Sequence, residues 1–126
     1  MDTFVVLGLP VPQGSMRHVG GGRIVSKSPA LKEWRSKVAD IIRQQVGEPA
    51  YPNAVRVNVI FNINKPKTVK RDLPTVPPDL DKLQRAIGDA ISIDVKYLLD
   101  DSQIVEWTAR KIYGSPAGVI IQVELL

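Results

Sequence analysis

Four carboxylates stand out among the residues that could carry out chemistry. Asp79 and Asp81 lie one residue apart in the segment PDLDKLQRAIGDAI, residues 78–91, and Asp100 and Asp101 are adjacent further along the chain. The sequence has no cysteine and a single histidine, so a metal site formed here would be built from oxygen ligands. Such sites hold hard cations such as Mg²⁺ or Mn²⁺ rather than Zn²⁺. Converging carboxylates would suit hydrolysis of a phosphodiester.

The first aspartate pair also has a purely structural explanation. Pro77 and Pro78 direct the chain into an extended approach, which puts Asp79 at or near the N-cap of a helix and Asp81 in its first turn. Aspartate is favoured at both positions, because it interacts well with the free N–H groups and the positive end of the helix dipole. Capping accounts well for one aspartate. Two of them, followed by a second pair at the start of a predicted strand, are less expected from capping alone.

Two further charged residues follow on the same predicted helix face. Arg85 lies one turn after Asp81 and forms either an i, i+4 ion pair, worth a few tenths of a kcal/mol, or a contact to a phosphate that carries developing charge. Asp89 comes one turn later. We favour a structural or supporting role for Asp89 over direct chemistry.

The charge of the chain is unevenly distributed. Residues 79–106 contain seven acidic and three basic residues, a net charge of −4, whereas the remainder contains six acidic and 14 basic residues, a net charge of +8. A basic surface favours a polyanion such as nucleic acid, and metal ions would let the acidic block approach it. A solvated acidic helix and loop is the alternative explanation.

Two segments without a helical or strand pattern carry much of the positive charge. Residues 13–27 are rich in glycine and predict a flexible loop or a loose hairpin, and residues 64–78 contain several prolines and predict an extended loop. Their basic residues are candidates for contacts to DNA phosphates, with ordinary solubility as the alternative. These candidates are Arg17, Arg23, Lys27, Lys65, Lys67, Lys70 and Arg71.

Hydrophobic spacing predicts two main helices and four strands. Strands are expected at residues 3–9, 54–63, 103–112 and 119–125, and helices from Ser28 to Gly47 and from residue 80 to about 92. This order predicts a single α+β domain over residues 1–126, with a mixed β-sheet of about four strands and two helices packed on it. Because the connection between the last two strands is short, we expect them to pair antiparallel.

Side-chain alternation also predicts which residues of these elements are buried. Val105, Trp107 and Ala109 are expected to share one face of the strand at 103–112. Trp34 lies on the apolar stripe of the first helix. Core packing is therefore the favoured role for both tryptophans, ahead of stacking on a nucleobase.

Composition narrows the class of protein. The absence of cysteine excludes disulfides and thiol nucleophiles and is typical of a cytoplasmic protein. No apolar run approaches the roughly 18 residues that a membrane span needs, so no membrane association is expected. The N-terminal residues do not resemble a signal peptide.

The segments PDLDKLQRAIGDAIS, residues 78–92, and LLDDSQIVEWTARKIYG, residues 98–114, resemble the RusA family of Holliday junction resolvases. In that family a D-x-D pair opens a helix, a lysine follows one turn after the second aspartate, and a D-D-x-Q-[IV] segment opens the next strand. The resemblance is close over residues 78–114 and looser over the opening strand and the first helix.

The resemblance implies a homodimeric, magnesium-dependent endonuclease that nicks two opposed strands of a four-way DNA junction in recombination and repair, with Mn²⁺ as a substitute metal. It implies that Asp79, Asp81 and Asp101 bind metal and are catalytic, that Asp100 is a further metal ligand, and that Arg85 is catalytic in the position where lysine is usual. Arginine still binds phosphate but is a poorer proton donor. Lys82 also departs from the asparagine that is common there.

Members of this family are often encoded by phages or prophages, which suggests the same origin here. Two alternatives remain. The protein could be a metal-dependent nuclease acting on other branched DNA, or a DNA-binding module whose carboxylates only cap helices and add solubility.

Overall fold

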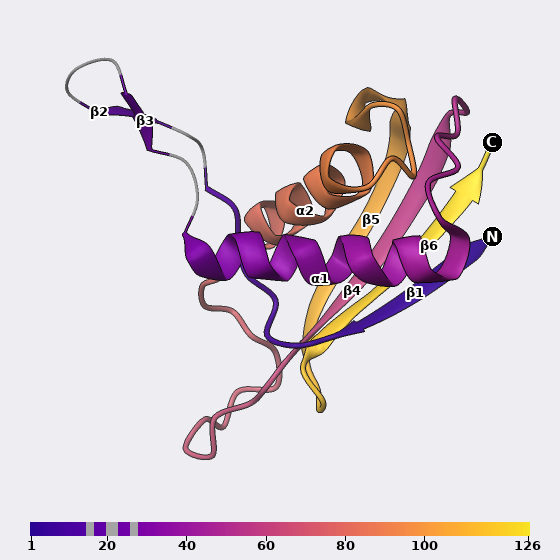
Figure 1. Ribbon diagram of the computed structural model, residues 1–126. Helices are drawn as coiled ribbons and strands as arrows, with labels where there is room; N and C mark the ends of the chain where they lie inside the picture. The colour runs from indigo at the N-terminus through magenta and orange to yellow at the C-terminus, as the bar shows by residue number, and fades with distance from the viewer. Residues whose placement is uncertain (15–16, 20–22, 26–27) are drawn as a thin grey trace.

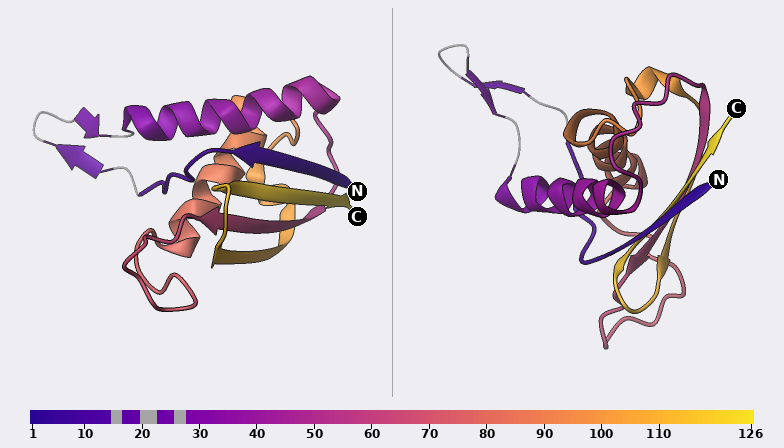
Figure 2. Two further views of the ribbon diagram at one scale, coloured as in Figure 1. Left: turned by 90° about the horizontal axis from the view of Figure 1, so that it is seen from below. Right: turned by 45° about the vertical axis from the view of Figure 1, so that its right-hand side comes forward.

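The computed structural model describes residues 1–14, 17–19, 23–25 and 28–126, and for residues 17–19 and 23–25 it describes the backbone (Figure 1). The elements in chain order are β1 (Asp2–Leu7), β2 (Arg17–Val19), β3 (Arg23–Val25), α1 (Pro29–Val46), β4 (Val55–Ile63), α2 (Leu80–Asp89), a π-helical turn (Ala90–Asp94), a 3₁₀ turn (Asp101–Gln103), β5 (Ile104–Tyr113) and β6 (Gly118–Leu125). Strands β2 and β3 pair as a small hairpin that projects from the molecule (Figures 1 and 2).

A mixed four-stranded sheet carries both helices on one of its faces (Figure 2). The strand order is β1-β6-β4-β5, in which β4 pairs parallel with β5 and antiparallel with β6, and β6 pairs antiparallel with β1. This arrangement confirms the α+β class, the mixed sheet of about four strands and the two main helices.

The predicted pairing of the last two strands is wrong. β6 steps over β4 and lies between β4 and β1, so β5 and β6 are not neighbours. Residues 114–117 connect them, and a step across one intervening strand covers roughly 10 Å, well within the reach of such a loop. The residues fit this order: β5 carries Glu106, Arg110 and Lys111 and suits an edge, whereas β6 buries Val119 and Ile121 and suits the interior.

Helix α1 begins and ends as its sequence predicts. The Ser28 hydroxyl accepts a hydrogen bond from the Leu31 N–H at 3.2 Å, and Pro29 occupies the first turn. Gly47, with φ of 75°, ends the helix and donates its N–H to the Arg43 carbonyl at 2.9 Å. Glycine adopts this left-handed conformation without steric strain.

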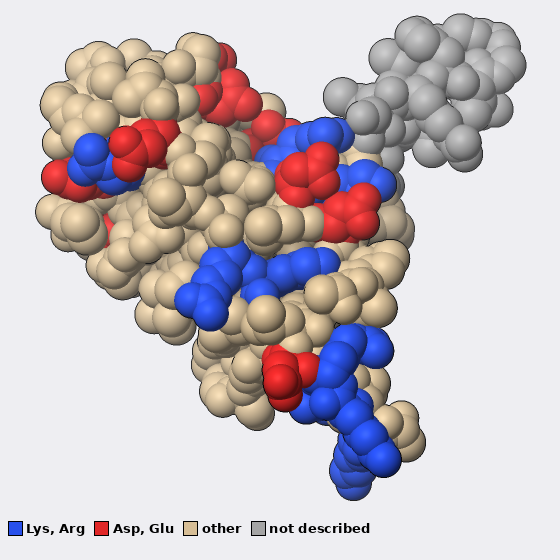
Figure 3. Space-filling view, turned by 180° about the vertical axis from the view of Figure 1, so that it is seen from behind, with Lys and Arg blue, Asp and Glu red and all other residues tan. Residues whose placement is uncertain are grey.

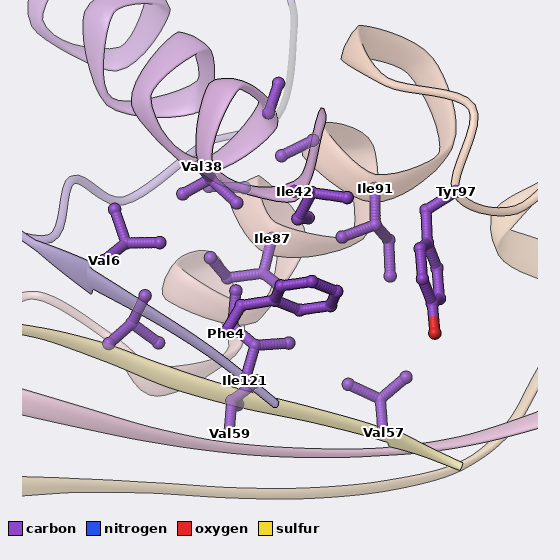
Figure 4. Close-up of a cluster of buried hydrophobic side chains, with 14 of the residues drawn as sticks. Phe4, Val6, Val38, Ile42, Val57, Val59, Ile87, Ile91, Tyr97 and Ile121 are labelled. Atoms are coloured by element: carbon purple, nitrogen blue, oxygen red, sulfur yellow. The ribbon is translucent and has the colours of Figure 1, made fainter. Parts of the chain in front are cut away.

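The core lies between the sheet and the two helices. Alternate residues of β4 and β6, including Val57, Val59 and Ile121, point toward Ile87 of α2, and Figure 4 shows them together. Trp34 is only 3% exposed, which confirms its predicted place in the core. Core packing therefore fixes α2 against the sheet, and with it the backbone positions from which its exposed side chains extend.

A buried arginine on α1 fixes the far end of α2. Arg35 donates two hydrogen bonds to the Asp94 carboxylate at 2.5 and 2.9 Å and lies 3.6 Å from Asp89. Gln13 connects the same group to the loop after β1, because its amide donates to Asp89 and accepts from Arg35. Its backbone N–H also donates to the Lys82 carbonyl in α2, at 2.9 Å.

Strand β5 begins with a β-bulge. Its register against β4 shifts between Val55 and Arg56, which leaves Val105 as the extra residue. Val105 is 64% exposed, so the prediction that it shares the buried face with Trp107 is wrong. Residues three apart in a regular strand point to opposite faces. Because of the bulge, Ile104 and Trp107 instead lie on the same face, toward the helices.

Candidate active site

A polar pocket of about 340 Å³ lies between α2 and the beginning of β5. It is lined by Asp81, Gln84, Arg85, Gly88, Asp101, Ile104 and Trp107. The first four of these residues are spaced i, i+3, i+4 and i+7, so they form one stripe along α2. The pocket therefore brings one aspartate of each sequence pair, Asp81 and Asp101, to a common space.

Asp79 is the N-cap residue of α2, as predicted, but its side chain makes no capping hydrogen bond. The carboxylate lies 3.3 Å from the Lys82 ammonium, and both side chains are about half exposed. Asp79 does not line the pocket. Its side chain therefore does not accept a helix N–H, and the interaction with the helix dipole is the structural reason that remains for an aspartate here.

Asp100, in contrast, is a structural cap. Its carboxylate accepts the Ser102 N–H at 2.9 Å, and its own N–H donates to the Gln103 amide oxygen at 2.8 Å, which together form a capping box. Hydrogen bonds from the Ser102 side chain and backbone hold the pKa of Asp100 below its usual range. Its role as a metal ligand stays a prediction, and one of its oxygens is already engaged.

Gln103 anchors this turn to the body of the protein. Its amide nitrogen donates to the Tyr51 and Asn53 carbonyls at 2.7 and 2.8 Å. The same side chain thus completes the capping box and attaches the turn that carries Asp101 to residues 51–53, which lead into β4. This gives the glutamine of the D-D-x-Q motif a physical role in placing the exposed Asp101 carboxylate at the pocket.

Arg85 and Asp81 form an ion pair at 3.7 Å, with side chains 42% and 69% exposed. A pair this accessible to water contributes little to stability, so it can exchange for a contact to an incoming anion. Asp89 points to a different environment, the group around Gln13 and Arg35. This contact agrees with the structural role favoured for Asp89.

The pocket at which a metal ion is expected to bind is lined by two carboxylates, those of Asp81 and Asp101. In the part of the chain that the structure describes, no three His, Cys, Asp or Glu side chains are grouped as a ready-made metal site. The two carboxylates of the pocket, Asp81 and Asp101, nevertheless fit magnesium, which is commonly held by one or two carboxylates together with water and substrate phosphate oxygens.

Six of the seven predicted DNA-contacting residues lie on described segments, namely the hairpin of β2 and β3 and the loop before α2. Lys65, Lys67, Lys70 and Arg71 are exposed on the loop of residues 64–79, where Figure 3 shows a concentration of basic side chains. Arg17 and Arg23 belong to β2 and β3, whose side chains are not described, and Lys27 lies outside the described residues.

The basic loop is attached to the end of β5. Arg71 donates to the Tyr113 hydroxyl at 3.0 Å, and the Lys65 ammonium lies 5.7 Å from the centre of the same ring. Lys111 donates to the Val76 and Pro78 carbonyls at 2.7 and 2.9 Å. These contacts fix the path of the chain directly before Asp79.

Four pocket residues were not recognised from the sequence. Gln84 and Gly88 could have been found by extending the helical spacing from Asp81. Ile104 is the last residue of the D-D-x-Q-[IV] segment, which could have indicated it. Trp107 had no such signal, because the bulge that brings it to the same face as Ile104 depends on pairing with β4.

Comparison with known families agrees with the resemblance noted in the sequence. A family model described as Endodeoxyribonuclease RusA matches residues 8–124, nearly the whole chain. No curated protein matches the chain. None of the described helices is long and apolar enough to cross a membrane.

Proposed function

The chain belongs to the RusA endodeoxyribonuclease family, and from this premise we propose that it is a magnesium-dependent enzyme that resolves four-way DNA junctions by nicking two opposed strands. The observation that carries this proposal is the pocket that Asp81 and Asp101 share with Arg85. Cutting of Holliday junctions would place the protein in DNA recombination and repair. A cytoplasmic location and an origin in a phage or prophage belong to the same proposal.

The proposed metal ligands are Asp81 and Asp101 in the pocket, with Asp79 and Asp100 beside them in the sequence. A bound magnesium ion, or manganese in its place, supplies activation of water and stabilisation of the leaving oxygen. Asp81 and Asp101 are both exposed, so neither must lose a buried partner to accept an ion. This accessibility supports the assignment.

The protein's own cations act on the DNA. Arg85 is positioned to exchange its exposed pairing with Asp81 for two parallel hydrogen bonds to the phosphate being cut, where it stabilises developing negative charge. The basic loop of residues 64–79 contacts neighbouring phosphates and orients the junction. Its attachment to β5 through Lys111 keeps those contacts in a fixed relation to the pocket.

Paired nicking requires two pockets in one particle. A two-fold symmetric homodimer provides them in equivalent orientations on a junction that has approximate two-fold symmetry. The partner in solution is therefore a second copy of the chain, and the substrate is junction DNA.

A nicking assay on a synthetic four-way junction tests the proposal. The wild-type protein should cut two opposed strands with Mg²⁺ and neither strand without it, and it should leave matched linear duplex intact. Equal cutting of forks, flaps or linear DNA would contradict the proposed substrate. Binding without any cutting would favour a non-catalytic DNA-binding module.

Substitutions at the carboxylates test the proposed roles. Asp81→Asn and Asp101→Asn should reduce nicking by at least about 100-fold while junction binding is retained or tightened, because a charge that repels DNA is removed. Asp100→Ser keeps a capping side chain but removes the carboxylate, so a loss of nicking with an intact fold would support Asp100 as a ligand, and full nicking would show that it acts only as a cap. Asp40→Asn, an exposed change on α1, is the matched control. Full activity of Asp81→Asn would refute the assignment.

A further inference from the structure

Gly88 occupies a position in α2 where the fold would accept a larger residue. The helix continues beyond it into the π-helical turn, so Gly88 is interior, where glycine is less favourable than every residue except proline. Among the described residues, a Cβ added at Gly88 would contact only the Cζ2 atom of Trp107, at the ordinary van der Waals distance of 3.7 Å. Helix stability favours alanine here, and packing does not exclude it.

The side chain missing at Gly88 leaves space in the pocket. Gly88, Ile104 and Trp107 form an apolar side of the pocket, and Asp81, Arg85 and Asp101 form a charged side. Trp107 is half-buried, in contact with the core and with the pocket at once, so it departs from the purely internal role expected for it. The pocket therefore places an aromatic side chain beside groups suited to a phosphate.

We propose that this space seats one nucleobase next to the phosphate being cut, stacked on Trp107 and admitted by the absence of a side chain at Gly88. The inference rests on the proposed function, since it concerns the same pocket. A nucleotide combines an anionic phosphate with a flat apolar ring. The pocket offers Arg85 for the phosphate and the indole of Trp107 for the ring.

The base seat gives a physical reason for selecting a branch point over linear duplex. Moving a base out of its stack is unfavourable in an intact duplex and easier where pairing is already weakened, as at the crossover of a junction. Stacking on an aromatic ring tolerates any base. Gln84, also in the pocket, has an amide that both donates and accepts hydrogen bonds, so it can discriminate among bases.

Fluorescence of a labelled junction tests the seat directly. Junctions carry 2-aminopurine on either side of the cut position, and binding is measured in Ca²⁺ to prevent cutting. We expect the wild-type protein to change the 2-aminopurine emission at one of these positions, and Trp107→Leu to abolish that change. A wild-type complex with the same emission as free junction at every labelled position would overturn the proposal.

Gly88→Ala is the decisive variant, because it should fold at least as well as the wild type. We expect a midpoint of thermal unfolding that is equal or higher, and loss of the 2-aminopurine signal. Nicking should fall by at least about five-fold at limiting junction, because loss of one stacked base corresponds to roughly 5- to 150-fold. Gly14→Ala is the matched control, since an added Cβ there has no described neighbour within 4 Å.

The outcomes separate this inference from the proposed function. If the wild type fails to nick the junction with Mg²⁺, the proposed function is wrong. If the wild type nicks normally and Gly88→Ala nicks equally well with an unchanged 2-aminopurine signal, the enzyme is a junction nuclease without the base seat, and this inference alone is wrong.

Discussion

Arg35→Met should destabilise the protein by about 3 kcal/mol. The Arg35 side chain is 4% exposed and holds the carboxylates of Asp94 and Asp89, which are 30% and 20% exposed. Removing one partner of a buried ion pair is unfavourable by about 3–5 kcal/mol, since the remaining charge stays desolvated and unpaired. Partial access of water to the two aspartates places the expected loss at the lower end.

This free energy converts into a measurable shift in melting temperature. Unfolding entropy is about 2.1 cal/mol/K per residue, so for 126 residues a loss of 3 kcal/mol lowers the melting temperature by roughly 11 °C. Calorimetry and urea unfolding followed by circular dichroism would give the melting temperature and the free energy of unfolding independently.

Arg43→Met is the matched control for this prediction. Arg43 lies on the same helix and pairs with Asp40 at 2.9 Å, but its side chain is 44% exposed, so its loss should change stability by less than about 1 kcal/mol. Equal effects of Arg35→Met and Arg43→Met would refute the reasoning that burial gives the Arg35 group its importance.

Two further predictions concern Tyr97 and Lys111. Burial and the hydrogen bond to the Asp2 carboxylate, at 2.6 Å, raise the pKa of Tyr97 well above its usual value. Because the unfolded phenol loses its proton near pH 10 and the folded one keeps it, the unfolding free energy should fall by up to about 1.4 kcal/mol per pH unit above pH 10. Urea titrations at several pH values would measure this fall, and Tyr97→Phe should remove it. Lys111→Met should free the Val76 and Pro78 carbonyls, so trypsin should cut the loop of residues 64–79 several-fold faster in time-resolved mass spectrometry, and an unchanged rate would contradict the proposed attachment.

The sequence predicts the elements of this fold better than their arrangement. Local signals set the boundaries of α1, because Ser28 and Gly47 act on their own neighbours. The place of β6 between β1 and β4 depends on which strands compete for the buried positions. A short connection suggested a hairpin, but the apolar character of β6 was the stronger influence.

The candidate site was predictable where it follows helical spacing and motif, and not where it depends on sheet register. Asp81 and Arg85 follow from the D-x-D helix, and Asp101 from the segment that opens the next strand. Trp107 reaches the pocket because of the bulge at Val105, a property of strand pairing that a single sequence does not show. Asp79 is the N-cap residue that the sequence predicts, but of the two it is Asp100 whose side chain makes a capping hydrogen bond, which the sequence did not indicate.

The two carboxylates of the pocket are anchored to different layers of the molecule. Asp81 moves with α2, which Arg35 fixes to α1, whereas Asp101 belongs to the turn that Gln103 fixes to the segment leading into β4. The distance between the two carboxylates therefore depends on the position of the helices relative to the sheet. A sliding of one layer over the other, caused by a remote core substitution or by pressure, would open or close the pocket without a change to any residue that lines it.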